Sequence, residues 1–267
     1  MLTTVLLYCA LGSFVGVLAG LLGVGGGLVI VPILVFAFTY QQIPFDIIMH
    51  LALGTSLASI IFTSVSSFMA HHKHGAVDWT TVRRIVIGVM TGTFLGSCVA
   101  SLLSTVILKF FFVTFLYFVA YQFLTNRKPK PSRELPGPFG MFIVGNIIGV
   151  VSSLVGIGGG ALSVPFMIWC NVTVHRAIGT SAAIGLPIAI AGTFGFLVNG
   201  WGNPALPEYS LGFIYLPALL GIAAVSVLTA PLGVKLAHSL PVAKLKKIFA
   251  LLLIVVGTRM LWTIFQG

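Results

Sequence analysis

The sequence predicts an all-α, multi-pass membrane protein made of two repeats with inverted topology. Three observations support this prediction. They are apolar runs of span length, a duplicated glycine motif, and a distribution of basic residues that differs between equivalent loops of the two halves. Of the 267 residues, 58% are hydrophobic and only 7% are charged. Eight apolar runs are each close to the roughly 20 residues that cross a bilayer as a helix. The runs are Val5–Leu22, Ile47–Ala70, Ile85–Leu103, Val106–Leu124, Phe139–Val155, Ala177–Val198, Leu211–Leu236 and Ile248–Phe265.

The chain repeats itself in three places and in the same order. "GLLGVGGGLVIVP" at 20–32 returns as "SLVGIGGGALSVP" at 153–165, and "HLALGTSLAS" at 50–59 returns as "HRAIGTSAAI" at 175–184. "LGSCVASLLSTVILK" at 95–109 returns as "LGVKLAHSLPVAKLK" at 232–246. Ordered self-similarity of this kind indicates a duplication. We therefore expect a first repeat at 1–124, a polar linker at 125–138, and a second repeat at 139–267.

The basic loops predict how the repeats lie in the membrane. The segment "HHKHGAVDWTTVRR" at 71–84 and the linker are both basic, so we expect both to be cytoplasmic. The counterpart of that segment in the second half, "NGWGNPALPEYS" at 199–210, has no Lys or Arg. Equivalent loops then face opposite sides, which is typical of inverted repeats, and both termini lie on the periplasmic side.

Each half also contains one short apolar element, Leu28–Phe38 or Ala161–Cys170. At about 1.5 Å per residue, such a helix covers only half of a bilayer. Either each half crosses five times, or its first two elements form a re-entrant hairpin and three long helices cross. Both alternatives keep the inversion, and the sequence leaves them open.

The glycine runs predict helix breaks that bind an anion. A helix that restarts after such a run, at Leu28 or Ala161, exposes its first N–H groups and the positive end of its dipole. These groups form an anion site without a charged side chain. Close helix packing is the alternative, and it accounts better for the single glycines Gly88, Gly92 and Gly96. A dinucleotide fingerprint is excluded, because Leu28 stands where its last glycine belongs.

Each half carries a "GTS" tripeptide about 10–14 Å into its helix, counted from the expected N-caps Asp46 and Thr173. Hydroxyl groups at that depth can donate to an anion, or they can bond within and between helices. His50 and His175, near the starts of these helices, are candidates for proton or anion coupling, with interfacial capping as the alternative. The candidate substrate-binding residues are Gly25, Gly26, Gly27, Thr55, Ser56, Gly158, Gly159, Gly160, Thr180 and Ser181.

The charged residues limit the function classes. The net charge of +10 resides mainly in loops, which indicates topology and contact with lipid rather than nucleic-acid binding. The four acids, Asp46, Asp78, Glu134 and Glu208, lie in loops or at helix ends, so we expect no enzyme, no metal site and no cofactor. The expected partners are a small anion and membrane lipid, and a homo-oligomer is left open.

Together, the motifs resemble the TauE/SafE sulfite exporter family, also called the toluene-sulfonate uptake permease family. The residues concerned are the glycine break followed by proline (Gly23–Pro32, Gly156–Pro165), "AxGTS" (Ala52–Ser56, Ala177–Ser181) and the "LGxxxA…LK" close of each half. The resemblance implies a bacterial inner-membrane transporter of sulfite, thiosulfate or organosulfonates. The residues alone predict a small anion, with an anion channel and a non-transporting scaffold as alternatives.

Overall fold

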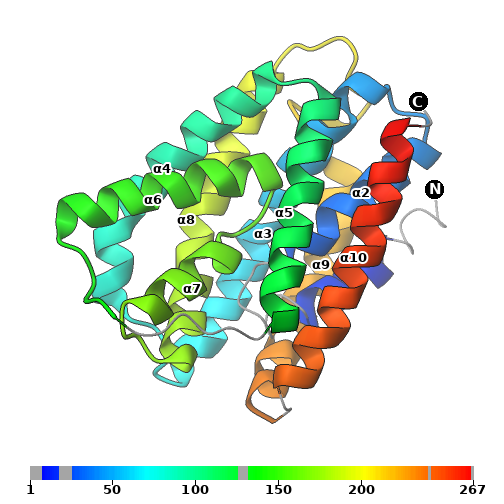
Figure 1. Cartoon of the computed structure of the whole chain (residues 1–267). Helices are drawn as coiled ribbons and strands as arrows, with labels where there is room; N and C mark the ends of the chain where they lie inside the picture. The colour runs from blue at the N-terminus through cyan, green and yellow to red at the C-terminus, as the bar shows by residue number, and fades with distance from the viewer. Residues whose placement is uncertain (1–7, 18–25, 126–131, 240–241, 266–267) are drawn as a thin grey trace.

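The computed structural model describes residues 8–17, 26–125, 132–239 and 242–265, and these residues are almost entirely helical (Figure 1). A short helix, Tyr8–Val17, comes first. It is followed by α2 (Gly27–Tyr40), α3 (Phe45–Lys73), α4 (Trp79–Leu102), α5 (Thr105–Thr125), α6 (Pro138–Val155), α7 (Gly160–Trp169), α8 (Val174–Gly200), α9 (Leu216–Ser239) and α10 (Val242–Phe265). Between α8 and α9, β1 (Ser210–Leu211) and β2 (Ile214–Tyr215) pair as an antiparallel hairpin.

Six helices of the described residues are long and apolar enough to cross a membrane. They are α3, α4, α5, α6, α8 and the Leu216–Gly233 part of α9. The chain is therefore an all-α, multi-pass membrane protein, as the apolar runs predicted. The short elements are also helices, and α2 and α7 have only 14 and 10 residues.

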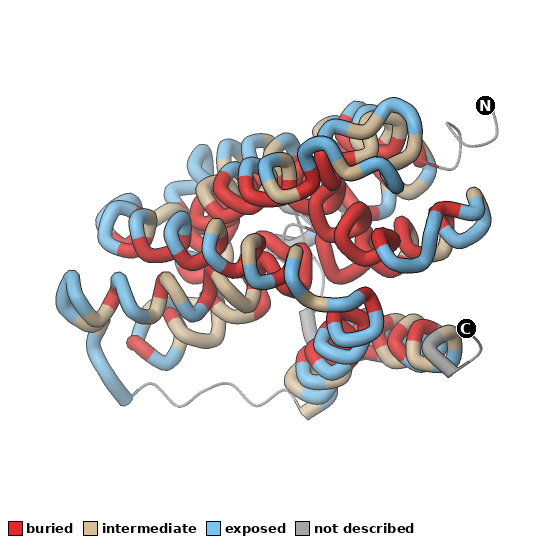
Figure 2. The backbone as a smooth tube through the Cα atoms, turned by 90° about the horizontal axis from the view of Figure 1, so that it is seen from above, coloured by how far each residue is buried: buried red, intermediate tan, exposed pale blue. Residues whose placement is uncertain are grey.

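The centre of the fold is the pair α3 and α8. The most apolar window of α3 is 78% buried and that of α8 is 61% buried, against 44% or less in the other candidate spans. α4 packs on α8 and on α6, α9 packs on α3, and α5 pairs with α10 at the side. Seen from above, the buried residues face the middle of the molecule and the exposed ones face outward (Figure 2).

Glycines allow α4 and α6 to approach closely. A Cβ atom placed on Gly88 or Gly92 of α4 would overlap the carbonyl oxygens of Phe142 or Asn146 on α6. On the other side, a Cβ atom on Gly149 would lie 2.5 Å from the carbonyl oxygen of Val89. Gly96 faces Ser153 in the same way. The packing interpretation of the single glycines in α4 is confirmed.

Two expected helix starts were wrong. α3 begins at Phe45 after an extended Pro44, so Asp46 lies in the first turn instead of acting as the N-cap. The apolar run that begins at Leu211 is not helical until Leu216, because Gly212, with φ of 53°, turns the chain into the β1–β2 hairpin. Thr173, in contrast, is the N-cap of α8, as expected.

The end of α7 lies beside the segment that leads into α6. The Ser132 backbone N–H donates to the Trp169 carbonyl at 3.2 Å, and Trp169 Nε1 donates to Ser132 Oγ at 2.8 Å. The Arg133 guanidinium also lies over the Trp169 ring, 4.9 Å from its centre. Since α7 is about 15 Å long, it covers half of a bilayer. This contact favours the re-entrant alternative for the second half.

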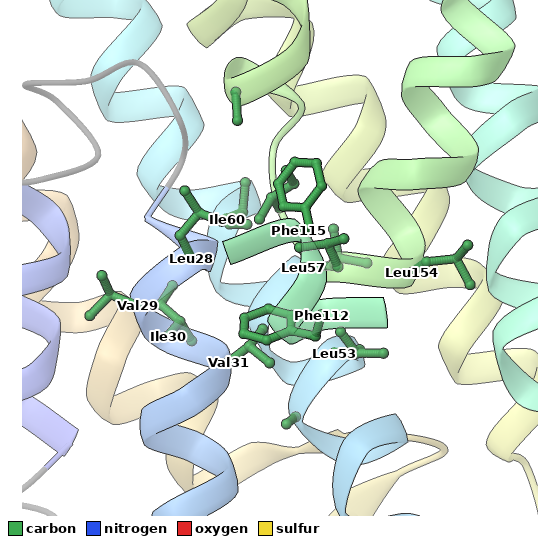
Figure 3. Close-up of a cluster of buried hydrophobic side chains, with 14 of the residues drawn as sticks. Leu28, Val29, Ile30, Val31, Leu53, Leu57, Ile60, Phe112, Phe115 and Leu154 are labelled. Carbon is green, nitrogen blue, oxygen red and sulfur yellow. The ribbon is translucent and has the colours of Figure 1, made fainter. Parts of the chain in front are cut away.

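The beginning of α2 is embedded in the hydrophobic core. Figure 3 shows the side chains of Leu28 to Val31 gathered with those of Leu53 and Leu57 from α3 and of Phe112 from α5. Leu28 is only 1% exposed and Phe112 is fully buried. This packing holds the N-terminus of α2 in the interior of the molecule. Without water there, the free N–H groups of the helix end need another hydrogen-bond acceptor.

Candidate functional site

The middle glycine of each glycine run has the same backbone conformation. Gly26, the N-cap of α2, has φ of 78°, and Gly159, the N-cap of α7, has φ of 76°. Residues other than glycine rarely adopt this left-handed backbone conformation. The helices restart at Gly27 and Gly160, one residue earlier than expected. Both predicted helix restarts are thus present in the structure, and residues 18–25, which include Gly25, lie outside the described residues.

The first backbone N–H groups of each new helix point away from the helix body. In α7, the first intrahelical hydrogen bonds are those of Leu162 and Ser163 to the Gly159 carbonyl, at 3.0 and 2.8 Å. The N–H groups of Gly160 and Ala161 precede these bonds. α2 begins in the same way, because Val29 and Ile30 donate to the Gly26 carbonyl at 3.0 and 3.1 Å. Each helix start therefore presents N–H groups that can donate hydrogen bonds to an anion.

The start of α2 contacts the break of the second half. A Cβ atom on Gly27 would overlap the Gly156 carbonyl oxygen and lie 2.9 Å from Ile157 Cα. The same carbonyl accepts a hydrogen bond of 2.8 Å from Ser56 Oγ of α3. Gly158 lies on the far side against α8, where its carbonyl oxygen is 3.2 Å from the position of a Gly185 Cβ. The two halves thus meet at the glycine breaks.

The Gly-Thr dipeptides of the two "GTS" motifs make matching contacts, which we call the threonine clasps. In the first clasp, Gly54 packs on the Phe213 carbonyl, and Thr55 Oγ1 accepts a hydrogen bond of 2.9 Å from the Tyr215 N–H. In the second clasp, the residues are Gly179, Ala76, Thr180 and Asp78, and the Asp78 N–H donates to Thr180 Oγ1 at 2.9 Å. Each central helix therefore holds the loop that follows the other central helix.

The clasps give Thr55 and Thr180 a structural partner. Their role in substrate binding stays a prediction. Ser181 is fully buried on α8, at the position that matches Ser56 on α3. Ser56 therefore lies next to the break that precedes α7, while the threonines hold loops.

The two candidate histidines have different surroundings. His50 is 6% exposed, and its Nε2 lies 3.1 Å from the carbonyl oxygens of both Ala100 and Leu103, at the end of α4. Since both neighbours are acceptors, Nε2 carries the proton and caps that helix end. His175, the counterpart in the second half, is exposed at the start of α8. The capping alternative describes His50 in this structure.

Two serines that the sequence reasoning passed over lie at the start of α7. Ser152, in the last turn of α6, has its Oγ 3.3 Å from the position of a Gly159 Cβ. Ser163 stands in the first turn of α7. Both are fully buried, and neither hydroxyl has a hydrogen-bond partner among the described residues. Hydroxyls inside the apolar stretches "VVSSLVG" and "GALSVP" were the available signal.

Comparison with known proteins identifies the family. The sequence profile described as "Sulfite exporter TauE/SafE" matches residues 8–260. The chain belongs to the TauE/SafE family. No solved structure matches it.

Curated relatives of this TauE/SafE chain carry a transporter description. A "Probable membrane transporter protein" of Haemophilus influenzae is 43% identical over 97% of this chain and 99% of its own length. A protein of Methanocaldococcus jannaschii with a similar description is 29% identical, with 94% and 92% covered. YunE of Bacillus subtilis, also a probable membrane transporter protein, is 29% identical over 72% of this chain and 78% of its own length. The family and the six apolar helices together identify a membrane transporter of the multi-pass kind.

The glycine breaks of this TauE/SafE chain lie in sequence without ionisable side chains. Residues 12–38 and 139–169 contain no Asp, Glu, Lys, Arg or His. Of the Lys and Arg side chains that the structure describes, Lys109 alone is buried, with its Nζ 4.5 Å from the centre of the Phe45 ring. Phe45 and Ser56 are about 16 Å apart along α3 by the rise of a helix. Within the described ranges, no three His, Cys, Asp or Glu side chains form a group suited to a metal.

Proposed function

We propose that this chain is a secondary transporter that moves a small sulfur-containing anion, such as sulfite, thiosulfate or an organosulfonate, across the bacterial inner membrane. The observation that supports this most directly is the pair of helix N-termini at Gly26 and Gly159, both left-handed and both next to the contact between the halves. Helix N-termini favour anions through their free N–H groups and their dipole. The family description and the transporter relatives support the same class of function.

The proposed binding site lies between the starts of α2 and α7. In this proposal Gly26, Gly27, Gly158, Gly159 and Gly160 provide backbone N–H groups and close access, and Gly25 adjoins them in the sequence. Ser56 bonds to the Gly156 carbonyl at the second break, and Ser181 is proposed as its counterpart in the second half. Discontinuous helices near the midplane serve this purpose in several classes of transporter. Because no carboxylate occurs in the break segments, we propose that the anion gradient and the membrane potential drive transport, without a carboxylate relay.

We also propose that the two halves have inverted topology. The threonine clasps support this, since α3 holds the loop after α8 and α8 holds the loop after α3. The exposed Arg83 and Arg84 at the start of α4 favour a cytoplasmic position for that end. The linker is then cytoplasmic, and both termini are periplasmic.

Uptake of labelled sulfite, thiosulfate and methanesulfonate into proteoliposomes tests the proposal, with and without imposed potential and pH gradients. Saturable uptake that follows the imposed potential is expected. The test variant is Gly159→Val, and its matched control is Gly137→Val. Gly137 precedes α6 and a Cβ there would meet nothing within 4 Å, so only Gly159→Val is expected to abolish uptake. Conductance that does not saturate would identify a channel, and no uptake by inserted, monodisperse protein would refute transport of these sulfur-containing anions.

A further inference from the structure

Two buried hydroxyls at the start of α7 have no hydrogen-bond partner in the part of the protein that the structure describes. Ser152 Oγ and Ser163 Oγ are fully buried and without a hydrogen-bond partner among the described residues. Burying a hydroxyl without a partner is unfavourable, so such groups are rare unless a ligand or water completes them. Both serines lie in the second half, one on each side of the same glycine break.

Most other buried serine and threonine hydroxyls of the described residues are paired, with Ser67 of α3 as an exception. Ser59 donates to the Thr55 carbonyl at 2.9 Å, and Thr93 donates to the Val89 carbonyl at 2.6 Å. A buried serine or threonine in a helix normally bonds back to its own helix like this. Ser152 and Ser163 could be satisfied by the same means and are not. Their hydroxyls are therefore available to a ligand.

Ser152 adjoins the N-cap of α7, and Ser163 lies in the first turn of that helix. Ser152 Oγ is 3.3 Å from the position of a Gly159 Cβ, so a side chain there would fill the space beside the hydroxyl. Ser163 belongs to the first turn of α7, and its own N–H bonds to the Gly159 carbonyl. The N–H groups of Gly160 and Ala161 lie between them in sequence. Together these groups offer hydroxyl and backbone donors, which suit the oxygens of an oxyanion.

The charge available at this place is small. One helix N-terminus is equivalent to about half a positive charge, so the starts of α2 and α7 together supply about one. No ionisable residue occurs in either break segment. A monoanion is thereby compensated, whereas a dianion would keep an uncompensated charge in a medium of low dielectric constant, where this is costly.

We infer that Ser152 and Ser163 bind the substrate oxygens at the start of α7, and that the transported species is a monoanion of sulfonate or hydrogen sulfite type. The inference rests on the proposed function, whose site it specifies. It excludes dianions such as thiosulfate and sulfate as good substrates. Sulfite, which takes up a proton near neutral pH, is then carried in its singly protonated form.

Uptake into proteoliposomes with equal pH on both sides tests the charge selectivity. Methanesulfonate, a monoanion throughout, is expected to enter at a rate that changes little between mildly acidic and mildly alkaline pH. Sulfite uptake is expected to rise as the pH falls, in proportion to hydrogen sulfite, and thiosulfate uptake to be at least about tenfold slower. If thiosulfate enters as fast as methanesulfonate, the monoanion inference is overturned while anion transport stands. If none of these anions enters, the proposed function fails with it.

Serine variants test the two hydroxyls. Ser152→Ala and Ser163→Ala are each expected to raise the KM for methanesulfonate by about 3- to 10-fold, as for a lost hydrogen bond, with little change in kcat. Ser163→Thr, which keeps the hydroxyl, is expected to restore most of the affinity. The matched control is Ser153→Ala, because the Ser153 hydroxyl is buried next to Ser152 but already donates to the Val150 carbonyl at 2.8 Å. An unchanged KM in both alanine variants would refute the assignment.

Discussion

The side-chain oxygen of Thr180 on α8 accepts a hydrogen bond of 2.9 Å from the backbone N–H of Asp78, which lies 102 positions earlier in the chain. Thr55 on α3 accepts an equal bond from the N–H of Tyr215, which lies 160 positions later. The glycine before each threonine packs on the same loop, two residues upstream of the donor. The motif "GTS" therefore fixes the contact between each central helix and a loop of the other half.

Replacing the clasp threonines should destabilise the fold. Valine has the shape of threonine but offers no acceptor, so Thr180→Val leaves the Asp78 N–H unpaired, and Thr55→Val does the same to Tyr215. We expect each change to lower the free energy of unfolding by about 1–3 kcal/mol. Thermal unfolding of the detergent-solubilised protein measures this, with Thr→Ser at both positions as the conservative control. A raised KM at unchanged thermal stability would show instead that the threonines bind substrate.

The left-handed glycines should not tolerate a side chain. A residue with a Cβ atom pays roughly 1–2 kcal/mol in this conformation, and at Gly159 a Cβ would also lie 2.5 Å from Ile188 Cδ1. We expect Gly26→Val and Gly159→Val to abolish transport while the protein still inserts. Gly75→Ala is the matched control, because Gly75 has φ of 66° but a Cβ there would meet nothing within 4 Å. Normal transport by both valine variants would place the site elsewhere.

Ser56→Ala should weaken substrate binding through the backbone. Without Ser56 Oγ, the Gly156 carbonyl loses a donor at 2.8 Å, and the break that precedes α7 is held less firmly. We expect the KM to rise by a few-fold to tens of fold, since a lost hydrogen bond is worth about 0.5–1.5 kcal/mol. Transport kinetics of Ser56→Ala and Ser181→Ala provide the measurement. Unchanged values for both would leave these serines with a packing role only.

His50 should contribute to stability more than to proton coupling. His50→Ala leaves the carbonyls of Ala100 and Leu103 without their side-chain donor, so we expect a loss of about 1–3 kcal/mol in the free energy of unfolding. His175→Ala, at an exposed position, should stay within about 0.5 kcal/mol. The pH profile of transport is the second readout. A profile that flattens in His50→Ala would assign the histidine to proton coupling.

The sequence was sufficient to predict what depends on local chemistry. The breaks at Gly26 and Gly159 could be placed to within one residue, because a run of glycines in an apolar helix has a local meaning. The helices could be located from hydropathy for the same reason. The hairpin at Ser210–Tyr215 was missed, since its residues continue an apolar run and only the turn at Gly212 separates them from α9.

The partners of the motif residues could not be predicted, because they lie more than 100 positions away in the chain. The tripeptide "GTS" does not indicate that its threonine accepts a hydrogen bond from the N–H of Asp78 or Tyr215. Ser152 and Ser163 were missed for a different reason. They do not recur in both halves, because the corresponding positions of the first half hold Ala19 and Ile30, which have no hydroxyl.

The threonine clasps have a consequence for the order in which the protein is assembled. A ribosome makes the loop ending at Asp78 long before it makes Thr180, so this loop waits with its N–H bound to water. The loop ending at Tyr215, in contrast, emerges when Thr55 is already in the membrane. The bond between Asp78 and Thr180 therefore forms only after α8 has been synthesised. The amino-terminal half reaches its final shape only when the carboxyl-terminal half arrives, and the two finish folding together.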